Sequence, residues 1–560
     1  MTETGQRQEE YNDKSKTRRY SIKQIQGGIW LSVATCFMLF LYAPLELLFT
    51  NQDEFWFDVY LLAPIMFPVF AVSCLISILV FALLQKWNAA LYRFGLAVYF
   101  IVFICLYVQG NLLTGSLPLL DGKPIDWSLY KKEYIQSYVL WVVAAAAVII
   151  IYRRIKHRTF ENMVKLAGIC MTLMFCVTLL TLALTNRGFE RKPGLSVTTK
   201  NMFQLSRNDN LLILVLDAVD ARNMNAILEE NPEYQDIFTD FTYFQNMLGA
   251  YPATRHAIPY MLSGKWYQNE TVFREYEAQA YAESPLFATL EEEGWRIGLY
   301  EAELLSNDGG KNRFGNILPG KRGINNKPMF LKWQIQLVGF KYAPYCLKSH
   351  TFVNLKDFNT TKIPPEGEEM FTMSNSVFYD KILHEEVSYT EDNCFRFMHI
   401  EGGHAPFIYN EKVEEIKPEN GSYEDNIKAS LTITREYINK LKEAGVYDNS
   451  AIIVMADHGY GWGDYFEQQN PIFFVKGKKE KHGFETSDAP VSYMDLQEAY
   501  VRLMNGAKSD QIFDWKSGDQ RERRYLFYEH SEEDYIMEYM QPGRADDANA
   551  MYQTGNVYAR

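Results

Sequence analysis

The chain has 560 residues, and its 56 Lys and Arg against 69 Asp and Glu give a formal net charge of −13. This acidic balance argues against a general nucleic-acid binder, which needs basic surface to neutralise phosphates. The length allows three or four domains, or one large α/β domain that absorbs most of the chain. Hydrophobic residues make up 48% of the chain, but they are crowded into its first third. The average composition therefore conceals two different regions.

Five apolar runs precede residue 187: Ile29–Phe49, Leu61–Leu84, Leu91–Val108, Tyr138–Tyr152 and Leu166–Leu184. Most approach the roughly 20 residues that a helix needs to cross about 30 Å of hydrocarbon. The fourth run is the shortest, although flanking residues could extend it. Long buried helices of a soluble core are the alternative, and five successive runs fit that alternative poorly. The sequence therefore predicts a transmembrane region of five helices over residues 28–186.

The positions of basic residues predict how these helices are oriented. Basic residues occur in the leading tail, residues 1–27 (Lys14, Lys16, Arg18, Arg19, Lys23), in the second loop (Lys86, Arg93) and in the fourth loop (Arg153, Arg154, Lys156, Arg158). The first loop, Asn51–Asp58, is acidic. Because cytoplasmic loops carry the excess of Lys and Arg, we expect a cytoplasmic tail and an extracytoplasmic chain after Asn186. The first run lacks an obvious small-residue cleavage site, so we interpret it as a retained anchor of a multi-pass protein of the cell membrane.

Residues 187–207 are polar and indicate a linker, and residues 208–560 are expected to form one extracytoplasmic domain. Short apolar runs alternate there with helical segments. The expected strands are Leu211–Leu216, Arg296–Tyr300, Phe395–Ile400, Ala451–Met455 and Ile472–Val475, and the expected helices are Asn223–Glu230, Leu286–Glu293, Tyr423–Ala444 and Asp495–Met504. Continuous apolar strands separated by helices indicate an α/β domain with a mostly parallel central sheet covered on both faces. Cys346 and Cys394 are the two cysteines outside the spans, and a disulfide between them is left open.

Polar side chains follow three of the expected strands. Asp217 follows Leu216, Asp457-His458-Gly459 follows Ala456, and Glu401-Gly402-Gly403-His404 follows Ile400. Ligands and substrates of parallel α/β sheets gather at the carboxyl ends of the strands. Each residue alone has an ordinary interpretation as a helix cap, turn former or loop residue, but together they indicate a site.

A fourth segment, Tyr251-Pro252-Ala253-Thr254-Arg255-His256, places a hydroxyl at the expected start of a short helix. Unpaired backbone N–H groups and the helix dipole favour an anion there. The alternative is that Thr254 only caps the helix. Arg255 could clamp an oxyanion or lie solvated on the surface.

These motifs resemble the alkaline phosphatase/sulfatase superfamily over about residues 208–510, and most closely its membrane-anchored branch of lipoteichoic acid synthases and phosphoethanolamine transferases. The resemblance equates Asp217 with the family's first acidic metal ligand and Asp457-His458-Gly459 with its late metal motif. Thr254 lies ten residues before Gly264, which is the family's spacing for the nucleophile. His399, Gly402 and His404 match a His-x-x-Gly-x-His motif.

The resemblance implies one divalent metal ion held by Asp217, Thr254, Asp457 and His458. The ion could be Mn²⁺, Zn²⁺ or Mg²⁺, because ligand type alone does not distinguish among them. No unambiguous second ligand set is present, although His404 and His482 are available. A threonine cannot mature to the formylglycine of sulfatases, so cleavage of sulfate esters is disfavoured.

The implied activity is transfer of a phospho-alcohol headgroup from a membrane phospholipid to a cell-surface glycan or polymer through a phospho-threonine at Thr254. His404 is the candidate for protonating the leaving alcohol or contacting phosphate, and loop packing is its alternative. Arg255 and His482 are candidate substrate contacts, and a solvated basic loop is the alternative for His482. Two other functions stay open: a tethered phosphodiesterase, phosphatase or sulfatase-like hydrolase, and a membrane-anchored binding protein with a relic site.

Overall fold

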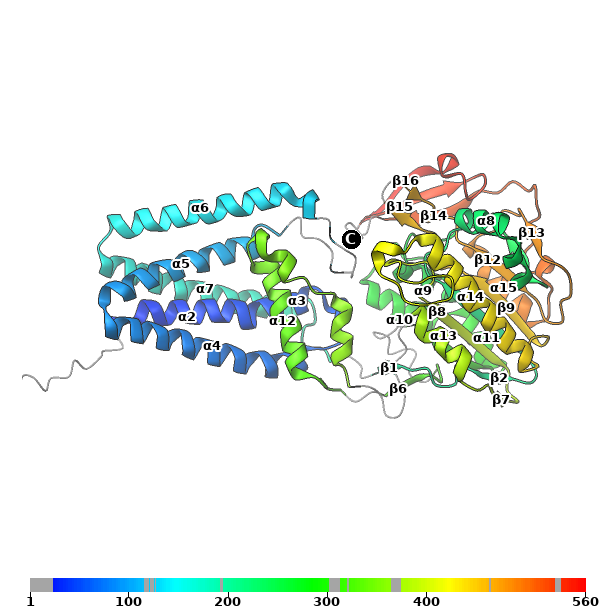
Figure 1. The fold of residues 1–560 in the computed structure, drawn as a ribbon, viewed down its shortest axis with the longest axis horizontal. Helices are drawn as coiled ribbons and strands as arrows, with labels where there is room; N and C mark the ends of the chain where they lie inside the picture. The colour runs from blue at the N-terminus through cyan, green and yellow to red at the C-terminus, as the bar shows by residue number, and fades with distance from the viewer. Residues whose placement is uncertain are drawn as a thin grey trace, which may run out of the picture. The chain divides into compact units, whose positions relative to one another are not determined.

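The computed structural model describes residues 24–114, 120, 125, 127–191, 195–301, 313–319, 322–363, 374–462, 465–528 and 535–559. The chain divides into two compact units. The helical unit comprises residues up to 192 together with 322–363, and the sheet unit comprises residues 193–321 and 364–560 (Figure 1). The basic residues Lys14, Lys16, Arg18, Arg19 and Lys23 of the expected cytoplasmic tail lie outside the described residues.

Within the described residues, five helical segments of the helical unit are long and apolar enough to cross a membrane, which confirms the prediction. They are Gln26–Thr50 (α2 Gln26–Phe37, η2 Met38–Tyr42, α3 Ala43–Thr50), α4 Val59–Trp87, α5 Ala89–Asn111, Trp127–Arg154 (η4 Trp127–Tyr130, α6 Lys131–Arg154) and α7 His157–Thr185. The fourth span is longer than its apolar run, because polar residues extend the helix at its N-terminal end. Large apolar side chains point outward from these helices; Leu75 is 68% exposed and Val177 is 64% exposed. An exterior of this kind is typical of helices that lie in a lipid bilayer.

The segment 322–363 packs against one end of the membrane helices, which the sequence analysis did not anticipate. It consists of α12 Lys327–Tyr342 and the 3₁₀ turns η8 Tyr345–His350 and η9 Leu355–Thr361, and α12 lies across the ends of α3, α4 and α5 (Figure 1). Lys341 pairs with Glu46 at 2.5 Å and Arg322 pairs with Asp58. The Trp56 indole donates a hydrogen bond to the Phe358 carbonyl at 2.8 Å.

A seven-stranded sheet forms the centre of the sheet unit. Its order is β13 (Glu485–Ser487), β4 (Thr242–Phe244), β12 (Phe473–Lys476), β9 (Ser450–Met455), β3 (Asn210–Leu216), β8 (Cys394–Ile400) and β5 (Arg296–Tyr300). Strands β9, β3, β8 and β5 are parallel neighbours, whereas β12 is antiparallel to both β9 and β4. The prediction of an α/β domain with a mostly parallel sheet is confirmed.

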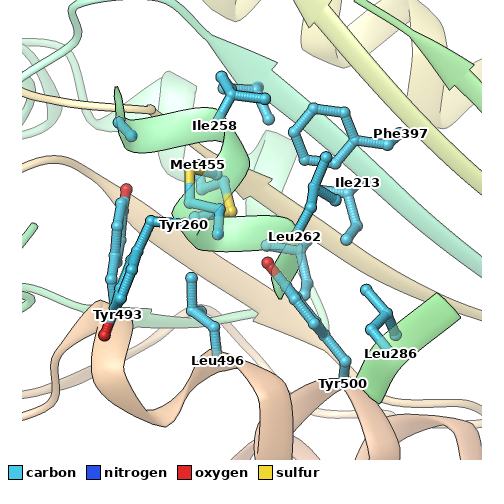
Figure 2. Close-up of a cluster of buried hydrophobic side chains, with 14 of the residues drawn as sticks. Ile213, Ile258, Tyr260, Leu262, Leu286, Phe397, Met455, Tyr493, Leu496 and Tyr500 are labelled. Atoms are coloured by element: carbon cyan, nitrogen blue, oxygen red, sulfur yellow. The ribbon is translucent and has the colours of Figure 1, made fainter. Parts of the chain in front are cut away.

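Side chains alternate between the two faces of this sheet, and helices cover both. Ile213 of β3 packs with Met455 and Phe397 under α9 (Thr254–Ser263), α11 (Pro285–Glu292) and α15 (Leu496–Met504) (Figure 2). Leu212 and Leu214 face α8 (Ala221–Glu230), α13 (Asn375–His384) and α14 (Tyr423–Glu443) on the opposite side. Because every residue of β3 is buried, the strand reads as one continuous apolar run, as expected for a strand covered on both faces.

The remaining elements lie around this sheet. They include the turn η5 Pro232–Phe238, helix α10 Phe273–Ala282, the pairs β1–β6 (Leu195–Val197, Ile317–Pro319), β2–β7 (Gln204–Ser206, Ser388–Thr390) and β10–β11 (Gly461–Trp462, Tyr465–Phe466), and an antiparallel sheet of β14 (Arg523–Phe527), β15 (Tyr535–Gln541) and β16 (Tyr552–Ala559). Cys346 and Cys394 are free thiols in the structure and belong to different units.

Candidate metal centre and nucleophile

Three buried side chains meet at the carboxyl edge of the sheet. Asp217 directly follows β3, and Asp457 and His458 follow the neighbouring strand β9. One potential ligand atom from each of the three lies within 4.8 Å of the others. The His458 Nε2 atom is 3.5 Å from the nearest oxygen of Asp217 and 3.5 Å from that of Asp457. The structure therefore brings together three of the four residues that the sequence analysis assigned to a metal.

Two glycines explain how the surrounding loops come so close to these ligands. Gly402 has a φ of +57°, and a Cβ there would lie 2.4 Å from the Asp217 backbone nitrogen. A Cβ on Gly459 would lie 1.8 Å from the Glu467 carbonyl oxygen. Only glycine fits such approaches, so both glycines of the sequence motifs have a steric role.

The turn after β3 joins the two aspartates. Ala218 has a φ of 56°, an uncommon conformation for a residue with a side chain, and its N–H donates a hydrogen bond to Asp457 Oδ1 at 3.1 Å. Burial alone would raise the pKa of Asp457, but His458, His399, the Thr254 hydroxyl and the Ala218 N–H together hold that pKa below its ordinary value. Asp457 therefore stays ionised although it is fully buried.

Thr254 is the first residue of α9, and its hydroxyl lies at the cluster. The Oγ1 atom is 3.5 Å from His458 Nε2, and the hydroxyl is near enough to Asp457 to help lower the pKa of that carboxyl. The N-cap of α9 is Ala253, and no side chain caps the helix. The interpretation of Thr254 as a plain helix cap is therefore wrong. Its side chain points to the aspartate and histidine.

A second buried histidine completes the cluster. His399, on β8, places Nε2 3.9 Å from carboxylate oxygens of both Asp217 and Asp457. Its Nδ1 contacts Glu301, which directly follows β5 and is buried. Burial would lower the pKa of His399, but Glu301, Asp457 and Asp217 raise it to about 10. The sequence analysis gave His399 as part of a motif and assigned it no role. It missed Glu301, although Glu301 directly follows the expected strand Arg296–Tyr300 and could have been found as a polar residue at a strand end.

These residues fit a divalent cation. Asp457 Oδ2 and His399 Nε2 are buried polar atoms without a hydrogen-bond partner among the described residues, and buried polar atoms normally have one. Two carboxylates and an imidazole form a donor set that suits Mn²⁺, Zn²⁺ or Mg²⁺. A bound cation would give the unsatisfied carboxylate oxygen a partner.

His404 and Arg255 lie in segments that border the cluster. The Gly403 N–H donates to the Asp217 carbonyl at 2.8 Å, which ties the loop that carries His404 to the first aspartate. The His404 N–H donates to the Glu401 carbonyl, and its own carbonyl accepts from Asn426 at 3.1 Å. Arg255, in the first turn of α9, stacks its guanidinium over the Phe273 ring at 4.5 Å. Both side chains are half-buried.

His482 does not join the other expected site residues. It follows β12, which runs antiparallel to β9, so the chain after Lys476 leaves the sheet at the edge opposite Asp457. His482 lies there beside Glu480 at 3.2 Å, and its backbone N–H donates to Asp240 at 3.1 Å. The sequence analysis grouped His482 with the substrate contacts because it could not foresee the direction of β12. This position gives that role no support.

The two aspartates and the histidine at the strand ends form a candidate metal centre, and the threonine hydroxyl beside them is a candidate nucleophile. The sulfatase family model matches residues 209–507, which is more than half of the chain. The chain therefore belongs to the sulfatase family. The five membrane-type helices fit the membrane-anchored branch that the sequence resembles.

Solved structures that are similar to this chain are distant in sequence. The lipoteichoic acid synthase LtaP from Listeria monocytogenes is 12% identical, with 62% of this chain and 88% of that chain covered and a TM-score of 0.35. A phosphonate monoester hydrolase from Silicibacter pomeroyi is 12% identical, with 63% and 89% covered and a TM-score of 0.33. A protein of the alkaline phosphatase superfamily from Vibrio parahaemolyticus is 12% identical, with 66% and 85% covered and a TM-score of 0.33. No curated protein matches the chain.

Proposed function

We propose that this protein transfers a phospho-alcohol headgroup, of the glycerol phosphate or phosphoethanolamine type, from a membrane phospholipid to a cell-surface glycan or polymer. The observation that carries the proposal is the Thr254 hydroxyl beside His458 and Asp457, in a chain that also has five helices fit to cross a membrane. A serine or cysteine matured to formylglycine would favour sulfate esters, whereas a threonine is suited to forming a phosphate ester.

The reaction is a double displacement at phosphorus. The Thr254 oxygen attacks the phosphorus of the lipid headgroup, the bond from phosphorus to the diacylglycerol oxygen breaks, and diacylglycerol leaves with a proton. An acceptor hydroxyl then attacks the phospho-threonine, and the bond from phosphorus to the Thr254 oxygen breaks. A divalent cation held by Asp217, Asp457, His458 and Thr254 would lower the pKa of the attacking alcohol and offset the charge on the phosphoryl oxygens.

The residues around Thr254 have distinct tasks in this scheme. Thr254 opens α9, where the positive end of the helix dipole favours the phosphoryl oxygens. His399, held by Glu301, keeps the two aspartates in place. His404, in the loop tied to Asp217, is proposed to protonate the leaving diacylglycerol oxygen or to contact phosphate, and Arg255 is proposed to contact a phosphoryl oxygen.

The membrane helices determine where this chemistry takes place. Lys86 and Arg93 lie around one end of α4 and α5, and Arg153, Arg154 and Lys156 lie at the same end of α6 and α7. If that end is cytoplasmic, the sheet unit is extracytoplasmic, and residues 208–560, apart from 322–363, are its catalytic domain. A domain tethered to the bilayer meets its lipid donor at a high effective concentration.

The experiment incubates the purified protein with a phospholipid labelled in its headgroup, with and without a cell-surface glycan. The proposal expects labelled glycan and free diacylglycerol from the wild type, and neither product from a Thr254→Val variant of normal thermal stability. Free labelled headgroup that accumulates equally with and without glycan would instead identify a hydrolase. Full activity of Thr254→Val would overturn the proposal.

A further inference from the structure

The helical unit contains a cavity far along the chain from Thr254. It has a volume of about 600 Å³ and lies between the N-terminal end of the Trp127–Arg154 span and the turn η8. Trp127, Tyr130, Lys131 and Tyr345 are among its lining residues. Cavities of this size are typical of sites for small molecules.

Fixed contacts hold the two walls of the cavity together. The Tyr345 backbone N–H donates to Ser137 Oγ at 3.1 Å, and Ser137 in turn donates to Gln109 at 2.6 Å. The Tyr345 ring lies 6.2 Å from the Trp127 ring and 6.1 Å from the Tyr130 ring, measured between centroids. The site is therefore formed by the fold and needs no ligand to assemble it.

Lys348 anchors the η8 wall from behind. Its side chain is fully buried and its ammonium donates to the Phe340 and Lys341 carbonyls, at the last turn of α12. Burial lowers the pKa of Lys348 to about 8. The Lys348 ammonium is occupied by these two carbonyls. Lys131 is the lysine among the residues that line the cavity.

The cavity continues into the apolar outer face of α6. Lys131, Tyr134 and Ile135 line the cavity, and residues three to four positions further along the helix lie on the same face. Those residues are Tyr138, Val139, Val142 and Val143, and each is between 53% and 65% exposed. A ligand in the cavity therefore has a continuous apolar path along a helix that is fit to cross the bilayer.

The composition of the lining is that of a membrane interface. Trp and Tyr gather where the hydrocarbon meets the headgroups, because their rings are apolar and carry one polar atom. Lys131 supplies a positive charge at the same level, and a lysine near the membrane surface attracts anionic lipids. The aromatic rings thus suit the headgroup region of a phospholipid, the lysine suits its phosphate, and the apolar stripe suits an acyl chain.

We propose that this cavity binds the headgroup end of one anionic glycerophospholipid, with the phosphate near Lys131 and an acyl chain along the stripe from Ile135 to Val143. The site holds the lipid without breaking a bond, so its occupancy does not depend on the chemistry at Thr254. Its lining residues belong to the helical unit, whereas Thr254 belongs to the sheet unit.

The test measures lipid binding to the full-length protein in detergent by native mass spectrometry. The probes are phosphatidylglycerol, which is anionic, and phosphatidylcholine, which has no net charge. We expect one phosphatidylglycerol to bind in preference to phosphatidylcholine, and the Lys131→Ala variant to lose about five-fold in phosphatidylglycerol affinity. Lys132→Ala is the matched control, because Lys132 is also exposed on α6 but does not line the cavity; it is expected to bind within two-fold of the wild type.

Three results would overturn the proposal. The first is equal phosphatidylglycerol affinity in the wild type and Lys131→Ala, and the second is an equal loss in Lys131→Ala and Lys132→Ala. The third is glycerol phosphate binding as tightly as the intact lipid, because the apolar stripe would then contribute nothing. A Thr254→Val variant that still binds phosphatidylglycerol normally would support the site and separate it from the failure or success of the proposed reaction.

Discussion

Acidic side chains with little solvent exposure are compensated differently in the helical unit and at the candidate metal centre of the sheet unit. In the helical unit, Glu46 pairs with Lys341 and Asp58 pairs with Arg322, so each acid is neutralised by a base. In the sheet unit, Asp217 and Asp457 lie together, and the groups beside them are the imidazoles of His458 and His399. Buried like charges are costly unless something compensates them, and a metal ion is the largest such charge a protein can hold. The ion pairs of the helical unit therefore stabilise its fold, whereas the aspartate cluster of the sheet unit is suited to binding a cation.

Removing one carboxylate from the sheet unit is expected to have the largest effect. An Asp457→Asn variant should lose about 10³-fold in transfer rate. The cation would lose a carboxylate ligand, and the Thr254 hydroxyl would lose a negatively charged neighbour. It should also lose the increase in melting temperature that added Mn²⁺ or Zn²⁺ produces in the wild type. Activity within ten-fold of the wild type would contradict the assignment, and Asp488→Asn at an exposed position controls for the loss of charge.

The next largest effect is expected from Gly402→Ala. The new Cβ would meet the Asp217 nitrogen at 2.4 Å and displace this aspartate, and misplacement of about 1 Å costs on the order of 10²-fold in rate. Gly445→Ala is the matched control, because Gly445 also has a positive φ of +69° but has no atom within 4 Å of its added Cβ. It should lose about 1 kcal/mol of stability and keep its activity. Equal activities of the two variants would refute the steric role of Gly402.

A Glu301→Gln variant tests the support behind the two aspartates. Outer partners of metal-site residues typically change affinity or activity by about 10- to 100-fold, and we expect the low end because the glutamine amide can still contact His399. Metal affinity, measured by calorimetry, should fall together with the rate. Glu292→Gln, at an exposed position of α11, should change neither quantity. Unchanged metal affinity in Glu301→Gln would leave Glu301 with a purely structural role.

The smallest effect on the catalytic centre is expected from the helical unit. Lys341→Ala should lower the stability of the protein in detergent by about 2 kcal/mol, because it leaves the half-buried Glu46 without its base. Metal affinity of the sheet unit should not change. Exchange of the two residues (Glu46→Lys with Lys341→Glu) should restore much of the melting temperature. A loss of metal affinity in Lys341→Ala would contradict the distinction between the structural ion pairs of the helical unit and the metal-binding cluster of the sheet unit.

The sequence was sufficient to predict the parts of the fold that depend on local pattern. The run Leu211–Leu216 is apolar throughout because both faces of β3 are covered, and Asp217 ends it at the metal-binding edge. The same rule finds Glu301 after β5, so this residue could have been identified from the sequence. Thr254 could also be placed at a helix start, but only the structure shows that Ala253 is the cap.

Other features depend on tertiary structure that the sequence does not encode locally. His482 lies at the opposite edge because β12 is antiparallel to β9, and a short apolar run does not reveal its direction. The segment α12 to η9 has no clear apolar stripe in its sequence, and it is held by membrane-helix residues almost 300 positions earlier, such as Glu46 for Lys341. Such long-range pairs are determined by the assembled fold.

The central claim is that the Thr254 oxygen becomes covalently bound to phosphorus during the reaction. The most direct measurement is the mass of the peptide that contains Thr254, in protein incubated with phospholipid in the absence of acceptor and quenched in acid. The account predicts that this peptide gains the mass of the phospho-alcohol headgroup in the wild type, that the gain is absent in Asp457→Asn, and that adding the acceptor removes it. An unmodified Thr254 in protein that turns over its lipid, or an adduct on another residue, would contradict the claim.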